Sequence, residues 1–295
     1  MGDVLILADS TRSPEMRHEV PIAVPDAFLY AEHDGRRVVV VSSLEAARIG
    51  EADPCLEVIP YEAVGLDELA ATGMEPAEAA LQMHTRACRR LGITSASVPA
   101  GFPLELADRL RENGVEITPD RALFESRRRR KTATEIAGLR LAQRACEAAL
   151  DAARVLLRRA SANGTLMLDG EPLTSERLKA EVERVFTEHG AYADEFIVAH
   201  GAQTTVGHEG GHGPILPGEV LDSGFFHSLG HGVGLEVHER PYLGRVGDDL
   251  VPGDVIALEP GLYRAGYGGV RLEDIAIVTD DGIEVVTDYP YELEP

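Results

Sequence analysis

Short hydrophobic runs and longer helical patterns alternate over the first 125 residues. The runs DVLILA, DAFLYAE and RRVVVVSS are rich in β-branched or aromatic residues and predict strands, and HDG between the last two predicts a hairpin turn. EPAEAALQMHTRACRRLGI and PLELADRLRENGV space their apolar residues three and four apart, which predicts helices that end at glycine caps. Strand-like SASVPA and EITP follow them. We therefore expect residues 1–125 to form an α/β domain.

The pattern changes at Thr132. Thr132 and Glu135 have the spacing of a capping box, which predicts that a helix starts here. Two long helical patterns follow, TATEIAGLRLAQRACEAALDAARVLLRRA and LTSERLKAEVERVFTEHG, and then strands interrupted by glycine continue almost to the C-terminus. Residues 132–295 are therefore expected to form a second domain, of the α+β class.

Charge excludes several classes of partner. The net charge is −22, which repels both nucleic acid phosphates and anionic lipid surfaces. Five consecutive basic residues in ESRRRRKTATE run against this trend, and taken alone they resemble a nucleic-acid or targeting patch. Because they lie between two structured segments, we interpret residues 126–131 as a connector between the domains. Neither nucleic acid nor a membrane is expected as a partner.

Composition indicates a globular chain. Hydrophobic residues make up 44% of 295 positions, enough for a sizeable core, and no apolar run reaches the length of a membrane span. The first residues lack the features of a secretory signal, so a cytoplasmic location is expected. Cys55, Cys88 and Cys146 are scattered and form no Cys-x-x-Cys pair. They predict neither a disulfide framework nor a thiolate metal site.

The stretch HSLGHGVGLEVHERP concentrates candidate chemistry. It starts at His227 and holds three of the ten histidines of the chain. His227 and His231 are four residues apart, as in a helical metal-binding pair, but the glycines between and after them disfavour a helix. We therefore place these residues on strands. Glycines beside a strand histidine allow another backbone, a metal or a ligand to approach closely.

Two acidic segments follow. IALEPGLY places Glu259 at the end of an apolar run, and GGVRLEDIAIV embeds Arg271, Glu273 and Asp274 in a strand-like sequence. Each residue taken alone is better explained as a surface or salt-bridged side chain. A charge in such a strand is costly to bury unless it is paired or bound to a metal. One histidine and two glutamates together form a donor set suited to Zn²⁺, Mn²⁺, Co²⁺ or Fe²⁺.

The order of these motifs resembles a known family. GHGVGLEVHERP, LEPGLY and GVRLEDIAIVTDDG are similar to the C-terminal half of the pita-bread metallopeptidases, which include aminopeptidase P, prolidase, methionine aminopeptidase and the non-metal relative creatinase. Residues 1–125 resemble the creatinase-type N-terminal domain of the proline-specific members. RRRRKTATEIAGLRLAQRA resembles their connector and first catalytic-domain helix. The resemblance implies a creatinase-like α/β domain followed by an α+β pita-bread domain.

The resemblance also implies an activity and a site. Two divalent ions activate a shared water in this family, and the water attacks the carbonyl of a short peptide, often one with proline at the second position. The implied metal ligands are His231, Glu259 and Glu273, of which Glu273 would bridge the ions. The other implied roles are stabilisation of the tetrahedral intermediate by His238, substrate contact by His208, orientation of Glu273 by Arg271 and support of the site by His227.

One departure from the family pattern is large. The family's other two ligands are aspartates, yet after GHGPILPGE the chain continues directly into VLDSGFFHSLGHG, where nothing resembles the second aspartate motif. We interpret this as an internal deletion around residues 219–225 that also removes two helices. Asp222 fits either the first aspartate motif or the lead-in to the next strand.

The deletion affects the expected metal content, the oligomeric state and the function of the chain. Without bridging aspartates two cations repel each other, so we expect at most one tightly bound divalent metal. Apolar faces left uncovered by the deletion suggest that a homodimer could complete the core. The chain is then an impaired Xaa-Pro peptidase, a non-catalytic peptide-binding protein, or a deleted product of a full-length peptidase.

Overall fold

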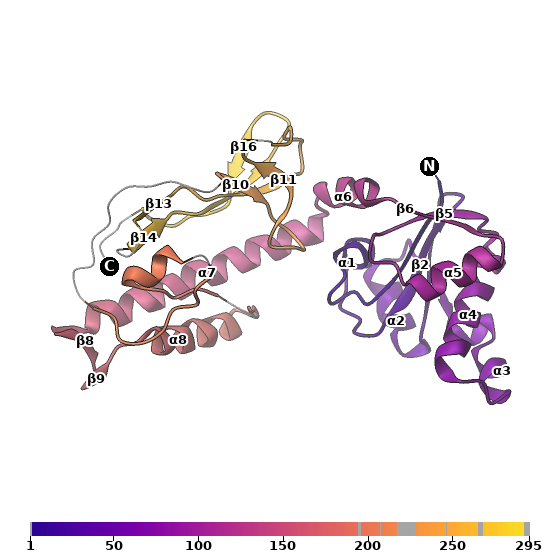
Figure 1. The fold of residues 1–295 in the computed structure, drawn as a ribbon, viewed down its shortest axis with the longest axis horizontal. Coiled ribbons are helices and arrows are strands. Elements are labelled where there is room, and N and C mark those ends of the chain that lie inside the picture. The colour runs from indigo at the N-terminus through magenta and orange to yellow at the C-terminus, as the bar shows by residue number, and fades with distance from the viewer. Residues whose placement is uncertain are drawn as a thin grey trace. The chain divides into compact units, whose positions relative to one another are not determined.

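The computed structural model describes residues 2–193, 196–206, 208–216, 228–245, 247–264 and 268–291 (Figure 1). Within it the chain divides into two compact units, Met1–Arg128 and Arg129–Pro295.

The first unit is built on a six-stranded mixed sheet. Its order is β4-β3-β2-β1-β5-β6, with β1 parallel to β5, β5 parallel to β6 and β3 parallel to β4. Asp34 and Gly35 both have positive φ, 50° and 74°, so the HDG hairpin turn is present as predicted. The strands are β1 (Val4–Ala8), β2 (Phe28–His33), β3 (Arg36–Val41), β4 (Glu57–Pro60), β5 (Ser95–Val98) and β6 (Glu116–Pro119).

Helices cover both faces of this sheet, which confirms the α/β class. One core includes Met16, Ile49 and Phe124, contributed by α1 (Pro14–Glu19), α2 (Ser43–Ala52) and α6 (Arg121–Arg129). The other includes Leu69, Met83 and Leu106, contributed by α3 (Leu66–Ala71), α4 (Pro76–Leu91) and α5 (Leu104–Glu112), and the turn η1 (Tyr61–Val64) precedes α3. The strands carry alternating side chains to both cores, as a sheet buried on two sides requires.

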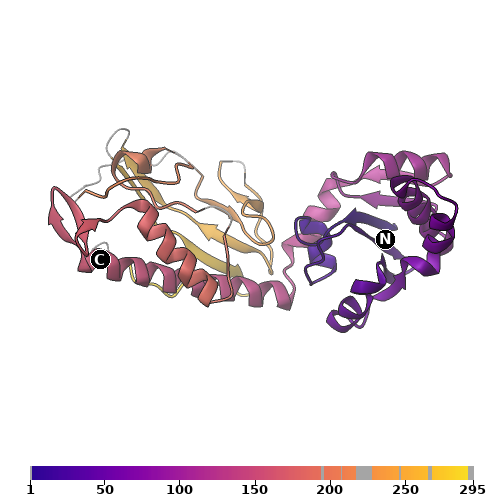
Figure 2. The same cartoon turned by 90° about the horizontal axis from the view of Figure 1, so that it is seen from below.

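The second unit begins with the two predicted helices. Helix α7 (Ala133–Arg159) starts at the expected capping box, because Thr132 Oγ1 accepts from the Glu135 amide at 3.2 Å and the Thr132 amide donates to the Glu135 carboxylate at 2.6 Å. Helix α8 (Ser175–Glu188) lies against α7 (Figure 2). Between the two helices lie three short antiparallel strands, β7 (Ser161–Asn163), β8 (Thr165–Leu168) and β9 (Glu171–Pro172).

A five-stranded antiparallel sheet follows, in the order β11-β10-β12-β15-β16. Two further strands form a short hairpin between β12 and β15 in the sequence. The turn η2 (Gly201–Thr205) precedes β10. This unit is α+β, as expected. The strands are β10 (Gly230–Gly232), β11 (Glu239–Leu243), β12 (Val255–Leu258), β15 (Asp274–Val278) and β16 (Ile283–Val285), and the hairpin strands are β13 (Gly261–Arg264) and β14 (Gly268–Arg271).

Apolar surface is less well covered in the second unit. Among the described residues, Leu44 and Leu104 are the exposed large apolar side chains of the first unit, and the others belong to the second. Along the whole of α7 the buried residues are Ala145 and Ala149. We keep as predictions that an internal deletion causes this exposure and that a second copy of the chain covers it. In the part of the chain that the structure describes, no helix is long and apolar enough to cross a membrane.

The basic run is distributed over a helix end and a following loop. Helix α6 extends to Arg129, so the run begins inside a helix. Arg127 pairs with Glu19 and Glu32 in the first unit, whereas Arg129 pairs with Asp254 in the second. Arg127 and Arg129 therefore have carboxylate partners within the protein.

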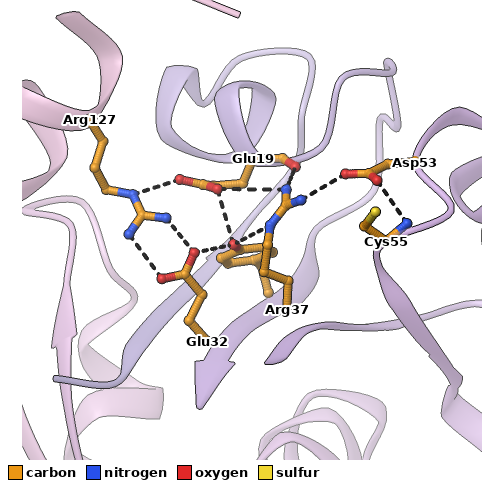
Figure 3. A network of polar contacts seen from close by, with 7 residues as sticks. Glu19, Glu32, Arg37, Asp53, Cys55 and Arg127 are labelled. Atoms are coloured by element: carbon orange, nitrogen blue, oxygen red, sulfur yellow. Dashed lines mark hydrogen bonds and ion pairs between the residues drawn. The ribbon is translucent and has the colours of Figure 1, made fainter. Parts of the chain in front are cut away.

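Arg127 takes part in a polar network of the first unit (Figure 3). Its Nε donates to Glu19 Oε1 at 2.8 Å and its Nη1 to Glu32 Oε2 at 3.0 Å, while the Tyr30 hydroxyl lies within 3.0 Å of both carboxylates. Burial raises the pKa of Glu32, but hydrogen bonds from Arg127 and Tyr30 outweigh burial and hold that pKa below its ordinary value.

Arg127→Met should lower the free energy of unfolding by about 3 kcal/mol, because it leaves the largely buried Glu19 and Glu32 without this cation. Chemical denaturation measures the loss. The matched control is Arg36→Met, which removes an exposed pair with Glu57 and should cost less than about 1 kcal/mol.

The difference in free energy of unfolding between wild type and Arg127→Met depends on pH. A carboxylate with a lowered folded-state pKa contributes stability above its ordinary pKa, and that contribution is lost as the pH falls through the folded value. The difference between wild type and Arg127→Met should therefore narrow below about pH 4. A difference that widens in acid would contradict the role given to Glu32.

Candidate metal centre

His231 lies on an interior strand of the second sheet. On β10 it pairs with Tyr242 of β11 on one side and with Ala257 of β12 on the other. The flanking glycines are required by close approach: a Cβ on Gly230 would lie 1.9 Å from the Ala257 carbonyl oxygen, and one on Gly232 would lie 2.2 Å from that of Arg240. The glycine pattern therefore allows neighbouring backbones to pack against the histidine strand, as predicted from the sequence.

Strand register brings the two glutamates together. Leu258 of β12 pairs with Asp274 of β15, and the strands are antiparallel. Glu259 follows Leu258 and Glu273 precedes Asp274, so both glutamates lie at the same end of this strand pair. The Leu272 amide donates to the Pro260 carbonyl at 3.0 Å and extends the pairing past them.

The side chains at this end contact one another. His231 Nε2 lies 2.7 Å from Glu259 Oε1, and both side chains are nearly buried. Arg271 Nη1 lies 3.3 Å from Glu259 Oε2, and its Nε lies 3.8 Å from Glu273 Oε2. The Arg271 guanidinium is therefore shared between Glu259 and Glu273, consistent with the predicted orienting role of Arg271.

The imidazole of His231 has a defined orientation. Its Nδ1 lies 2.9 Å from the Gly232 carbonyl oxygen, which can only accept, so we assign the Nδ1 proton to this hydrogen bond. Nε2 then faces the Glu259 carboxylate, and two acceptors this close need a proton or a metal cation between them. Metal-binding histidines are typically held in this way, through a second ring nitrogen that donates to a carbonyl.

His238 lies against His231, with ring centroids 4.3 Å apart. Partial burial lowers the pKa of His238, and the neighbouring His231 lowers it further. His208 and Arg271 add smaller effects in the same direction, and Glu259 opposes them. These effects favour the neutral form of the His238 ring.

The pKa of Glu273 is shifted upward, opposite to the shift of His238. Partial burial raises its pKa, and the negative charge of Glu259 raises it further, although Arg271 and His231 counteract them. A divalent cation near Glu273 would offset the negative charge of Glu259. The donor set of one imidazole and two carboxylates thus fits such a cation chemically.

Some predicted site residues are placed differently from the expectation. His208 is exposed in a turn with φ of 63°. Glu273 lies in the break between β14 and β15 and not within one continuous strand. Asp222 and His227 lie outside the described residues. Within the described ranges, no three His, Cys, Asp or Glu side chains surround a common point as ligands of an ion would.

Sequence reasoning did not identify one ion pair near the site. Lys131 Nζ contacts Glu239 Oε1, and their side chains are 2% and 5% exposed. Glu239 follows His238 directly in the HERP motif, and Lys131 ends the basic run. A carboxylate beside a candidate histidine was the signal that could have suggested Glu239, but nothing local indicates its partner.

Comparison with known proteins supports the motif assignments. Residues 216–280 match the model of metallopeptidase family M24. The resemblance to the pita-bread metallopeptidases is confirmed. Among curated relatives, “Probable dipeptidase PepE” of Mycobacterium tuberculosis is 52% identical over 71 residues, and the Xaa-Pro dipeptidase of Pyrococcus furiosus is 46% identical over 70 residues. Each match covers 23% of this chain, and it spans about a fifth of the relative, 19% and 20% respectively.

Solved structures extend the likeness from the M24 segment to the fold of nearly the whole chain. An Xaa-Pro dipeptidase from Bacillus anthracis superposes with a TM-score of 0.75 at 20% identity, covering 99% of this chain and 94% of its own. An X-Pro aminopeptidase from Thermotoga maritima gives 0.74 at 17% identity, covering 98% and 96%. The expected fold class, a creatinase-like α/β domain followed by an α+β pita-bread domain, is therefore confirmed.

Gly230→Ala should destabilise the second unit by about 1–3 kcal/mol, because the added methyl would overlap the backbone of β12. Denaturant unfolding measures the effect. Gly138→Ala is the control: this glycine lies within α7 with open space around its missing Cβ, so alanine there should stabilise the protein by about 0.5–1 kcal/mol. If Gly230→Ala left the free energy of unfolding unchanged, β10 would not need the close approach of its neighbouring strand.

Proposed function

We propose that this chain hydrolyses short peptides in a metal-dependent reaction of the Xaa-Pro aminopeptidase or dipeptidase type. The observation that carries the proposal is the meeting of His231, Glu259 and Glu273 with Arg271 at one end of the β10, β12 and β15 strands. These residues come from three separate motifs inside the segment that matches family M24. Named relatives of that segment include Xaa-Pro dipeptidases.

His231, Glu259 and Glu273 would hold a divalent cation such as Mn²⁺, Co²⁺, Zn²⁺ or Fe²⁺. When bound, the cation supplies an acidified water and a Lewis acid for the peptide carbonyl. His231 is pre-oriented by its hydrogen bond to Gly232, and Arg271 holds Glu259 and Glu273 toward each other.

The histidines outside the donor set act on the substrate. The neutral His238 ring keeps one N–H that can donate to the oxyanion of a tetrahedral intermediate. This hydrogen bond strengthens as negative charge develops on the oxygen. The exposed His208 is assigned to contact with the peptide by analogy with the family. Specificity for a free N-terminus and proline at the second position is proposed by analogy with the relatives.

Activity assays test the proposal. Purified protein loaded in turn with each of the four cations should hydrolyse Xaa-Pro dipeptides or short Xaa-Pro peptides. Glu259→Gln should lower kcat/KM at least about 100-fold by removing a ligand charge. The control is Glu284→Gln, on the exposed strand β16, which should leave kcat/KM unchanged.

Two results would contradict parts of this function. Equal cleavage of long denatured proteins and Xaa-Pro dipeptides would overturn the specificity. Peptide binding without hydrolysis under every cation would favour the non-catalytic peptide-binding alternative, for which the absence of a three-donor cluster among the described residues is the supporting observation.

Metal stoichiometry should be at most one tightly bound divalent ion per chain. His231, Glu259 and Glu273 can neutralise one cation, whereas two cations a few ångströms apart repel strongly without further bridging carboxylates. Elemental analysis after dialysis measures the ratio. A value close to two would show that Asp222 or another carboxylate replaces the missing aspartates.

A further inference from the structure

We propose that Lys131 is a positioning residue, which holds His238 against His231 through its ion pair with Glu239. The role given to His238 rests on the proposed function, but its position relative to His231 does not.

The Lys131–Glu239 pair is deeply buried. The two side chains are 2% and 5% exposed, and both belong to the second unit. Taking two charges out of water costs free energy, so such a pair is retained where it fixes a geometry that apolar contacts would leave loose. Most other ion pairs of this unit involve at least one side chain that is far more exposed, such as Arg140 with Glu284.

Both ends of the pair are tied to the sheet that carries the site. The Lys131 amide donates to the Gly253 carbonyl at 3.5 Å, just before β12. Glu239 begins β11, and its Oε2 accepts from the Glu236 amide at 3.4 Å. Glu239 therefore reaches back across the loop that carries His238.

The loop before Glu239 has few other buried anchors. Gly232 and Glu239 are buried, whereas the residues between them, 233–238, are half-buried or exposed. A Cβ on Gly234 would lie 2.7 Å from Glu239 Oε1 and 2.7 Å from Lys131 Cε, so the loop backbone packs directly on the pair. Because His238 is adjacent to Glu239 and its ring reaches His231, a shift of this anchor moves the ring.

The distance between the two rings provides a direct readout. Ring centroids 4.3 Å apart place protons of His231 and His238 within the range of a nuclear Overhauser effect (NOE). We expect this NOE in the wild-type protein without added metal. Its absence there would overturn the proposal, whatever the peptidase activity.

Three variants separate positioning from stability. Lys131→Met leaves Glu239 buried without its partner. The double variant Lys131→Met with Glu239→Leu replaces the pair by apolar side chains of similar size, which proteins usually tolerate without unfolding. Arg140→Met with Glu284→Leu makes the same change at an exposed pair of the same unit and serves as the control.

The folded double variant should lose the NOE between His231 and His238, while the control keeps it. With an Xaa-Pro dipeptide, its kcat should fall about 10- to 100-fold while KM changes less than about threefold, since His238 is assigned to the transition state and not to ground-state binding. A folded double variant that keeps both the NOE and wild-type kcat would overturn the proposal. If wild type shows the NOE but hydrolyses no peptide, the proposed function fails and the positioning role is still decided by the NOE.

Discussion

The close approach of β10 to its two neighbouring strands is the constraint on which the candidate site depends. His231 stands on the central strand of this region, and its partner Glu259 follows the strand that pairs with it. A side chain at Gly230 would push these backbones apart. The antiparallel register of β12 and β15 then adds Glu273 beside Glu259. Three residues from separate motifs thus meet because of backbone pairing.

Electrostatics would favour a cation at this end of the sheet. Glu259 and partial burial raise the pKa of Glu273, and Arg271 and His231 compensate incompletely. A surface designed only for stability would not place these carboxylates together. A raised carboxyl pKa beside a second carboxylate is common at functional sites.

The basic run shows how pairing changes the meaning of a charge pattern. As a sequence it is a block of five cations in a strongly acidic chain. In the structure Arg127 joins a buried network around Tyr30, Arg129 holds the fully buried Asp254, and Lys131 holds Glu239. These three cations are each paired with a carboxylate of the protein, and their side chains are largely withdrawn from solvent.

The sequence by itself determined the main elements and the candidate residues. Local periodicity, the Thr132 capping box, the glycine caps and the HDG turn were predictable because they depend on neighbouring residues. Motif order identified His231, Glu259, Glu273, Arg271 and His238, which the structure brings together. The turn at His208, the strand break at Glu273 and the pairing of Lys131 with Glu239 were decided by tertiary structure alone. Partners separated by more than a hundred residues leave no local periodic signal, and contact between them follows only from how the sheet and the helices pack.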